Sequence, residues 1–238
     1  MKTKLLLIGL QLICFMIFCQ NTSIVKDVDG NTYKTVQING LEWMAENLSV
    51  KHFNDKTALK ETTSIEEWGS LSKNGIPLFT EMSYQKEGGS GCGLVYNWYA
   101  VSDGKGLCPK GWRVPTFDEW IGFSEYEAVK IKSKKGWQLY YDFFSDTEFD
   151  TNGSDDFGFN ALPCTFNMFD PLMYGEDERM PDIFTPFFGI GTSWACSSED
   201  EKDSNKVWYA SLYYANSNIL FNTIEKQEMA CFVRCVKE

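Results

Sequence analysis

The stretch CPKGWRVPTFDEW, residues 108–120, contains the clearest helix start in this chain. Pro115 precedes Thr116, which suits an N-cap, and Glu119 stands three residues later, where it completes a capping box. The spacing therefore predicts a helix that begins after Thr116. Its apolar side comprises Trp120, Phe123 and Tyr126 or Glu127, and its basic end, which complements the helix dipole, comprises Lys130, Lys132, Lys134 and Lys135.

Strand-like segments precede this helix. Residues 24–28, 32–38 and 41–44 are short runs separated by Asp29-Gly30 and Asn39-Gly40, and such dipeptides favour hairpin turns with positive φ. The sequence thus predicts two successive hairpins near the N-terminus.

A second, shorter helix is predicted after Ser64, because Glu67 again stands at the capping-box position. Beyond Gly136 the chain returns to short strands and turns, and residues 208–214 and 232–236 have the strongest strand character. The pattern predicts an α+β fold with few helices, and we find no internal repeat or linker that would divide it into domains.

Composition excludes several classes of protein. Hydrophobic residues make up 43% of the 238 residues, enough for a buried core, so disorder and fibrous architectures are excluded. The net charge is -11, which repels phosphate backbones and argues against a nucleic-acid partner.

The N-terminus has the pattern of a secretory signal peptide. Lys2 and Lys4 precede an apolar run that ends near Phe18, and cleavage is expected before Gln20. We therefore expect residues 1–19 to be a signal peptide, residues 20–238 to form one domain, and the protein to be secreted or held on the extracellular surface without a transmembrane segment. The alternative is a lipid anchor at Cys19, which the bulky Phe18 disfavours.

Six of the eight cysteines remain after such cleavage, and an even number in an oxidising compartment favours disulfides. A zinc site is disfavoured because the chain has no CxxC pair and a single histidine, His52. A regular strand would separate Cys231 from Cys235 by about 13 Å, so we do not expect these two to bond to each other.

Five ordered blocks carry a resemblance to a known family. They read KDVDGNTYKTVQINGLEWMAENL at residues 26–48, GLVYNWYAV at 93–101, CPKGWRVPTFDEW at 108–120, GSDDFGFNALP at 153–163 and FVRCV at 232–236. The chain resembles the Fibrobacter succinogenes major paralogous domain family of secreted and surface proteins, found in Bacteroidota and Fibrobacterota. The resemblance implies a C-type lectin-like domain with a small irregular antiparallel sheet, two helices and long loops. It implies no activity.

The same resemblance suggests which cysteines pair. Cys108 and Cys235 are shared with many relatives, which implies a disulfide between them. The other four are departures from the family pattern and suggest two further disulfides, whose three possible connectivities stay open. We prefer Cys92 with Cys196 and Cys164 with Cys231.

Three kinds of chemistry have sequence candidates. The family is distantly similar to formylglycine-generating enzymes, which hold copper between two thiols, so a copper-dependent oxidase is the alternative function. Disulfides are favoured over a copper site, because an exported chain with an even number of cysteines usually pairs them. His52 near Ser49 is more typical of an exposed histidine than of a general base. The acidic run from Asp146 to Asp156 predicts at most a loose calcium site, because Phe159 occupies the position where an EF-hand needs glutamate.

The segment of residues 166–188 matches the family poorly and mixes aromatic residues with acids and prolines. Such a loop on a rigid scaffold is typical of a recognition surface, although it could equally fold onto the body. We therefore expect a non-catalytic binding or structural module whose ligand is a glycan or a surface protein. The candidate binding residues are Phe169, Tyr174, Glu176, Asp177 and Phe184.

Overall fold

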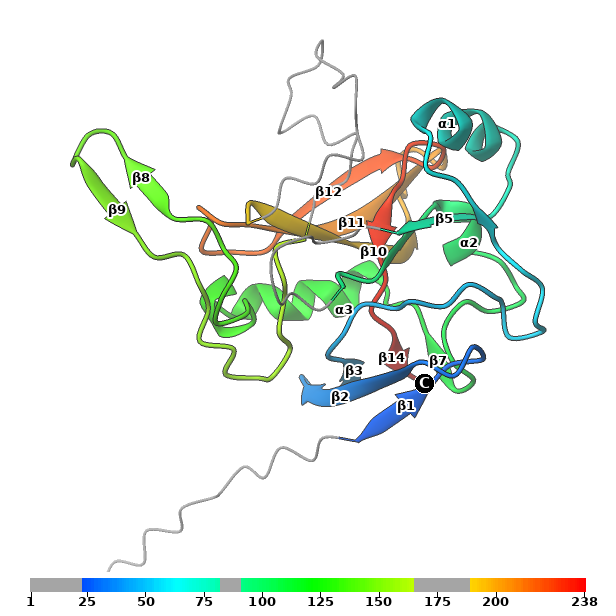
Figure 1. The fold of residues 1–238 in the computed structure, drawn as a ribbon, viewed down its shortest axis with the longest axis horizontal. Helices are drawn as coiled ribbons and strands as arrows, with labels where there is room; N and C mark the ends of the chain where they lie inside the picture. Colours follow the sequence, from blue (N-terminus) through cyan, green and yellow to red (C-terminus); the bar gives the residue numbers. More distant parts are fainter. Residues whose placement is uncertain (1–22, 82–90, 165–188) are drawn as a thin grey trace, which may run out of the picture.

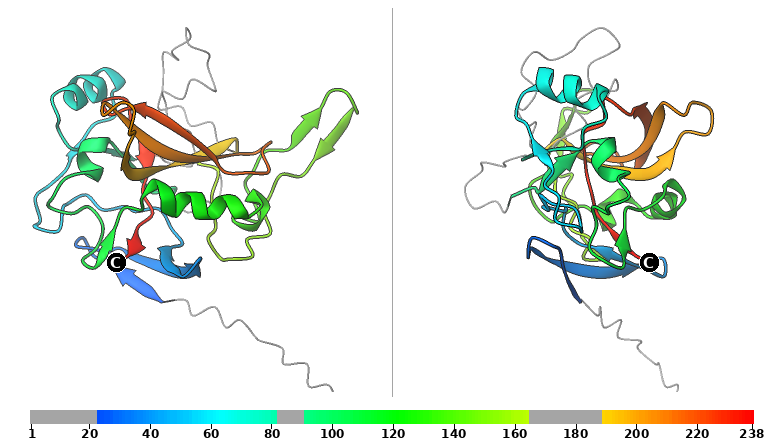
Figure 2. Two further views of the ribbon diagram at one scale, coloured as in Figure 1. Left: turned by 180° about the vertical axis from the view of Figure 1, so that it is seen from behind. Right: turned by 90° about the vertical axis from the view of Figure 1, so that its right-hand side faces the viewer.

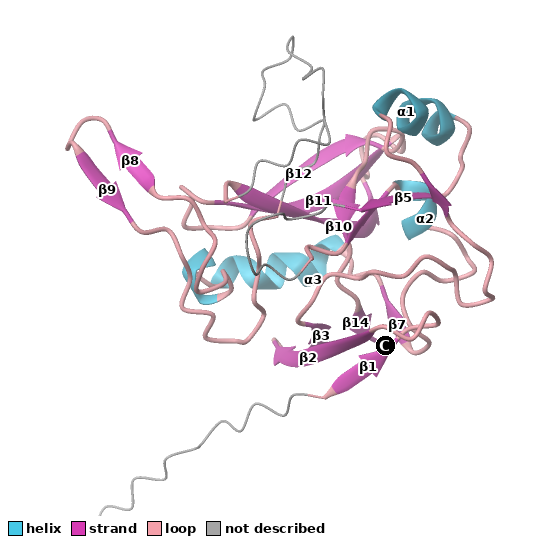
Figure 3. Ribbon diagram, in the orientation of Figure 1, coloured by secondary structure: helices cyan, strands magenta, loops and turns pink. Residues whose placement is uncertain are grey.

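The computed structural model describes residues 23–81, 91–164 and 189–238. Two β-sheets lie one above the other with a helix between them, and a two-stranded ribbon projects from one side (Figure 1). Figure 3 shows that strands predominate, and the described part of the chain contains three α-helices. The α+β expectation agrees with this architecture.

The smaller sheet joins the two ends of the chain. Its five strands lie in the order β1 (Ile24–Lys26), β2 (Thr32–Ile38), β3 (Leu41–Met44), β14 (Val236–Lys237) and β7 (Trp112–Arg113). Asn39 and Gly40 connect β2 to β3 with φ values of 53° and 78°, as the sequence predicted for this hairpin. The C-terminal strand β14 pairs with β3 through Val236 and Trp43.

The larger sheet has seven strands in the order β12, β11, β10, β13, β6, β5 and β4. Their bounds are β12 (Leu220–Glu225), β11 (Lys206–Tyr213), β10 (Gly191–Glu199), β13 (Cys231–Phe232), β6 (Leu94–Tyr96), β5 (Leu78–Glu81) and β4 (Lys60–Glu61). The short strand β13 lies in the middle, parallel to β10 and antiparallel to β6. The chain then passes directly into β14 of the smaller sheet. The predicted strand 232–236 is therefore two strands in two sheets.

Helix α1 (Ile65–Lys73) begins at the predicted N-cap, Ser64, whose hydroxyl accepts a hydrogen bond from the backbone N–H of Glu67. Helix α2 (Trp98–Val101), which the sequence did not predict, is capped by Asn97. Helix α3 (Phe117–Ile121) has the complete capping box of Thr116 and Glu119.

Helix α3 is shorter than the sequence predicted. It is followed by the 3₁₀ turns η1 (Gly122–Glu125) and η2 (Ala128–Lys130). The carbonyl of Gly122 accepts a hydrogen bond from the Asn39 side chain, and the Ala128 N–H donates to the carbonyl of Ser217. These backbone groups are bonded to distant segments instead of the α-helical ladder, so the lysines after residue 129 do not form a helix end.

The aromatic core explains why α3 lies between the sheets. Trp120 packs edge-on against Trp43 of β3 at 4.9 Å between ring centroids and stacks on Trp194 of β10 at 5.3 Å. Phe123 and Phe159 complete the cluster, and all five rings are at most 1% exposed. Burial of these rings against both sheets fixes the two layers relative to each other.

Strands β8 (Tyr140–Asp142) and β9 (Thr147–Phe149) form the projecting two-stranded ribbon, residues 140–149. Figure 1 and the left panel of Figure 2 show it extending away from both sheets. The turn at its tip contains Phe143 and Phe144, whose exposed fractions are 86% and 103%. These exposed aromatic rings bury no surface in the core and so do not stabilise the fold, which indicates a role in binding.

Candidate functional site

The loop that the sequence favoured for binding is not among the described residues. Phe169, Tyr174, Glu176, Asp177 and Phe184 lie outside the described residues, as do the predicted signal peptide and Cys19.

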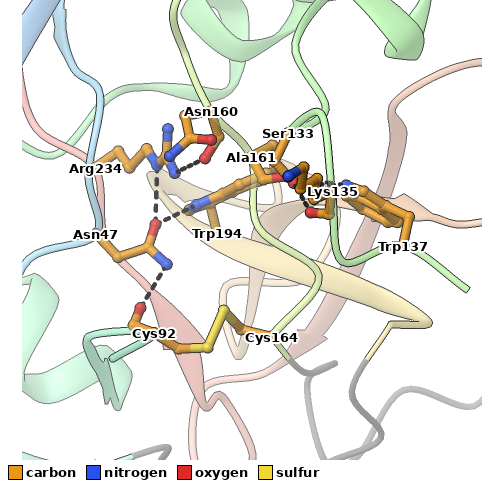
Figure 4. Close-up of a disulfide and its surroundings, with 10 residues drawn as sticks. All are labelled: Asn47, Cys92, Ser133, Lys135, Trp137, Asn160, Ala161, Cys164, Trp194 and Arg234. Atoms are coloured by element: carbon orange, nitrogen blue, oxygen red, sulfur yellow. Dashed lines mark hydrogen bonds between the residues drawn. A yellow bond between two sulfur atoms is a disulfide. The ribbon is translucent and has the colours of Figure 1, made fainter. Parts of the chain in front are cut away.

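The disulfides are Cys108–Cys235 and Cys92–Cys164. The first is the pair implied by the family resemblance. The preferred pairs Cys92–Cys196 and Cys164–Cys231 are wrong, because the block ending in Cys164 returns beside Cys92 while Cys196 and Cys231 are carried by strands β10 and β13 of the larger sheet. Figure 4 shows the Cys92–Cys164 bond close to Asn47, whose side chain donates to the carbonyl of Cys92; both cysteines belong to the buried core.

Cys196 and Cys231 belong to neither disulfide, and both are buried. Trp194 pairs with Phe232 across β10 and β13, and side chains alternate along each strand, so Cys196 shares a face with Trp194 while Cys231 points to the opposite face. Burial also raises the pKa of the Cys196 thiol well above its usual value.

His52 is partly exposed, and its Nδ1 lies 2.7 Å from Asp29 Oδ1. The backbone N–H of Ser49 donates to the hydroxyl of Tyr33, and no hydrogen bond joins Ser49 to His52 among the described residues. The arrangement agrees with the expected exposed histidine.

The acidic run 146–156 forms β9 of the ribbon and the chain that returns from it. Asp146 lies in the tip turn, whereas Asp155 accepts a hydrogen bond from the Asn160 N–H. Among the described residues, no group of three or more His, Cys, Asp and Glu side chains is placed to hold a metal ion. The loose calcium site stays a prediction.

A pocket of about 440 Å³ lies at the base of the ribbon, a size typical of small-molecule sites. We call it the ribbon pocket. Its walls come from four places: the end of the α3 region, the base of the ribbon, the strand that returns from it, and the turn between β11 and β12. The residues are Glu127, Val129, Lys132, Tyr140, Phe149, Asp150, Thr151, Asn152, Tyr214, Ala215, Asn216, Ser217 and Asn218.

Three aromatic rings line the ribbon pocket. Tyr140 and Phe149 are cross-strand partners whose centroids are 6.3 Å apart with near-parallel planes, and they are 38% and 48% exposed. The ring of Tyr214 lies 6.2 Å from that of Tyr140, tilted by 53°. The rings therefore offer apolar faces that the protein itself does not cover.

The opposite wall is polar. Asn216, Ser217 and Asn218 form the turn after Tyr214, and among the described residues their side chains make no hydrogen bond. Asp150 is occupied by the backbone and side chain of Asn152. An amide side chain offers both donors and an acceptor, so this wall can bond to a ligand that carries hydroxyl groups.

Lys132 forms the floor of the ribbon pocket and is 3% exposed. Its ammonium donates to the carbonyls of Tyr214 and Asn216 at 3.0 and 3.1 Å, and it lies 4.6 Å from the centroid of the Trp137 ring. Desolvation lowers its pKa to about 8. Lys132 thus holds the turn that carries the side-chain amides of Asn216 and Asn218, and its charge faces the two backbone carbonyls to which it donates.

Trp137 anchors the base of the ribbon. Its Nε1 donates to Ser133 Oγ and to the carbonyl of Ala161 (Figure 4). Its backbone N–H donates to Asn152 Oδ1. The aromatic wall is therefore built on a rigid support.

A second cavity of about 430 Å³ includes Asn31, Tyr33, Asn47 and Arg234 in its lining. Its polar groups are bonded within the protein: the Arg234 guanidinium donates to Asn47 Oδ1 and to the carbonyls of Phe159 and Asn160, and Tyr33 donates to Asp27. Burial lowers the pKa of Arg234 to about 9. The polar groups of this cavity hold core segments of the protein together, so the ribbon pocket is the better candidate for binding.

Sequence reasoning missed the ribbon pocket. The local signal was present, because Tyr140-Tyr141 and Phe149 flank the polar and aromatic stretch 142–148, as in a hairpin with an exposed tip. We assigned residues 146–156 by their acids alone, and nothing local connects them to Tyr214.

The fold and the pocket define a mixed α+β domain with two interleaved disulfides and one open aromatic site. The family model described as the Fibrobacter succinogenes major domain matches residues 36–237, and the chain belongs to this family. No curated protein and no solved structure matches the chain. Within the described residues, no helix is long and apolar enough to cross a membrane.

Proposed function

We propose that this member of the Fibrobacter succinogenes major domain family is an exported, non-catalytic module that binds carbohydrate in the ribbon pocket. The observation that carries the proposal is the pairing of uncovered aromatic faces, Tyr140 and Phe149, with an unengaged amide wall at Asn216 and Asn218. A sugar ring has an apolar face of C–H groups and an edge of hydroxyls, and these two walls match them.

Export is supported by the signal-like residues 1–19 and by the two disulfides, which persist in oxidising compartments. The binding role is favoured over the alternative, a copper-dependent oxidase, because the Cys196 thiol is buried with a raised pKa, whereas a copper site needs accessible thiolates. A C-type lectin-like relationship is part of the same proposal, and an experimental structure compared with such domains would test it.

The test is titration calorimetry of residues 20–238 with neutral glucan, xylan and mannan oligosaccharides. We expect Tyr140→Ala to weaken binding about fivefold, because one stacked ring contributes on the order of 1 kcal/mol. Tyr141→Ala, measured with a single sugar unit that does not extend to the ribbon tip, is the matched control: Tyr141 has the same 38% exposure, but as the next residue of β8 it points to the other face of the ribbon. Equal affinities of the two variants, or binding of a surface protein with no sugar bound, would refute the proposal.

A further inference from the structure

The ribbon extends the aromatic surface well beyond the pocket. Tyr140 stands at the pocket at the start of β8, and Phe144 stands in the tip turn, two residues beyond the end of that strand at Asp142. The strand alone separates the two positions by about 7 Å. Phe144 is fully exposed, and no ring contact involves it among the described residues. A single sugar ring in the pocket cannot reach it.

The turn that presents Phe144 is held by local hydrogen bonds. Asp142 accepts from the Phe144 N–H at 2.9 Å and from the Ser145 hydroxyl at 2.8 Å, and Tyr141 donates to Asp146. The backbone that carries the tip ring is therefore fixed before any ligand arrives, which reduces the entropy lost on binding.

Charge decides which ligand this surface accepts. The ribbon and the residue after it carry Asp142, Asp146, Glu148 and Asp150 and no basic residue. The nearest cation in the pocket, Lys132, is buried and directed at two carbonyls. An anionic polymer, an anionic bilayer and a second copy of the same ribbon would all meet like charges.

We infer that the ligand is an uncharged polysaccharide chain that occupies the ribbon pocket with one ring and continues along the ribbon to Phe144. This inference rests on the proposed function and adds a minimum chain length and a charge preference to it. Phe144 is separate from the pocket, so only a chain of several linked sugar rings can contact both.

The experiment measures affinity against chain length for neutral gluco-, xylo- and manno-oligosaccharides of one unit and of six, with galacturonate oligomers as the anionic series. For wild type we expect an increase of about tenfold or more in affinity from the single unit to the hexamer. Phe144→Ala should abolish this increase and leave the affinity of the single unit unchanged. Phe143→Ala is the control, because its ring packs on Tyr141 at 4.8 Å.

Three outcomes would contradict the inference. Equal affinities for short and long neutral chains would refute the extension along the ribbon and leave the pocket intact. Galacturonate hexamers that bind as tightly as neutral hexamers would refute the charge preference. If no oligosaccharide of any length binds, the proposed function itself is wrong, and the inference is refuted with it. Circular dichroism of each variant verifies folding.

Discussion

Asn47 joins three parts of the molecule through one side chain, and its removal should be unusually costly. Its Oδ1 accepts from Trp194 Nε1 at 3.0 Å and from Arg234 Nε at 2.9 Å, and its Nδ2 donates to the carbonyl of Cys92 at 2.8 Å (Figure 4). Trp194 and Arg234 are at most 1% exposed. In Asn47→Ala these two donors and one acceptor lose their partner.

The magnitude follows from the cost of buried groups without partners. Each such group costs about 1–3 kcal/mol, with charged donors at the upper end. Asn47 and Cys92 line the second cavity, so water can reach the carbonyl and the guanidinium and reduce the cost. We therefore expect Asn47→Ala to lower the free energy of unfolding by about 3 kcal/mol, a large part of the stability of a typical domain.

The assay is equilibrium urea unfolding with the disulfides intact. Asn54→Ala is the matched control, since the Asn54 side chain makes one comparable bond, from Nδ2 to the carbonyl of Cys108 at 2.8 Å. It should cost about 1 kcal/mol. If the two variants differ by less than about 1 kcal/mol, Asn47 does not hold the core together and the reasoning fails.

Three further predictions follow from other residues. Burial lowers the pKa of Lys132 from 10.5 to about 8, so the folded state binds fewer protons than the unfolded state between these pH values. The free energy of unfolding of the wild type should therefore rise by about 3 kcal/mol as the pH increases over that range. Urea unfolding of Lys132→Met at the same pH values should lack this increase. Residues 20–238, denatured without reductant, should show thiol reactivity at Cys196 and Cys231, and a third disulfide found by mass spectrometry would contradict the pairing. Gly153→Ala should lower the melting temperature markedly, at a cost of about 3 kcal/mol, because the new Cβ would lie 1.9 Å from the carbonyl oxygen of Lys132. Gly69→Ala is the control and should stabilise the protein, because nothing lies within 4 Å of the new Cβ on that helix face. Similar effects of the two substitutions would refute the packing argument.

Features set by neighbouring residues were predictable from the sequence. The hairpin at Asn39-Gly40, the N-cap at Ser64 and the capping box at Thr116 form as expected, because turn geometry and capping depend on a few adjacent side chains. The capping box predicted at Ser64 is incomplete, because the Glu67 carboxylate accepts from the Thr62 hydroxyl instead. The end of α3 was not predictable. It depends on Asn39 and Ser217, which are distant in sequence and capture backbone groups that a longer helix would use.

The disulfide pairing and the site depend on distances that the sequence does not contain. The pair Cys108–Cys235 came from a family resemblance, whereas the choice among the other four cysteines needed the path of the chain. The ribbon pocket combines Tyr140 with Tyr214, which are 74 positions apart and come together only when the larger sheet is assembled.

The order of the two disulfides along the chain has a consequence for survival among extracellular proteases. Their loops overlap, so both bonds span every peptide bond between Cys108 and Cys164. The projecting tip at Phe143-Phe144 is an obvious target for cleavage, and it lies within that overlap. A nick there would leave the two pieces doubly cross-linked, and denaturing electrophoresis would separate them only after reduction.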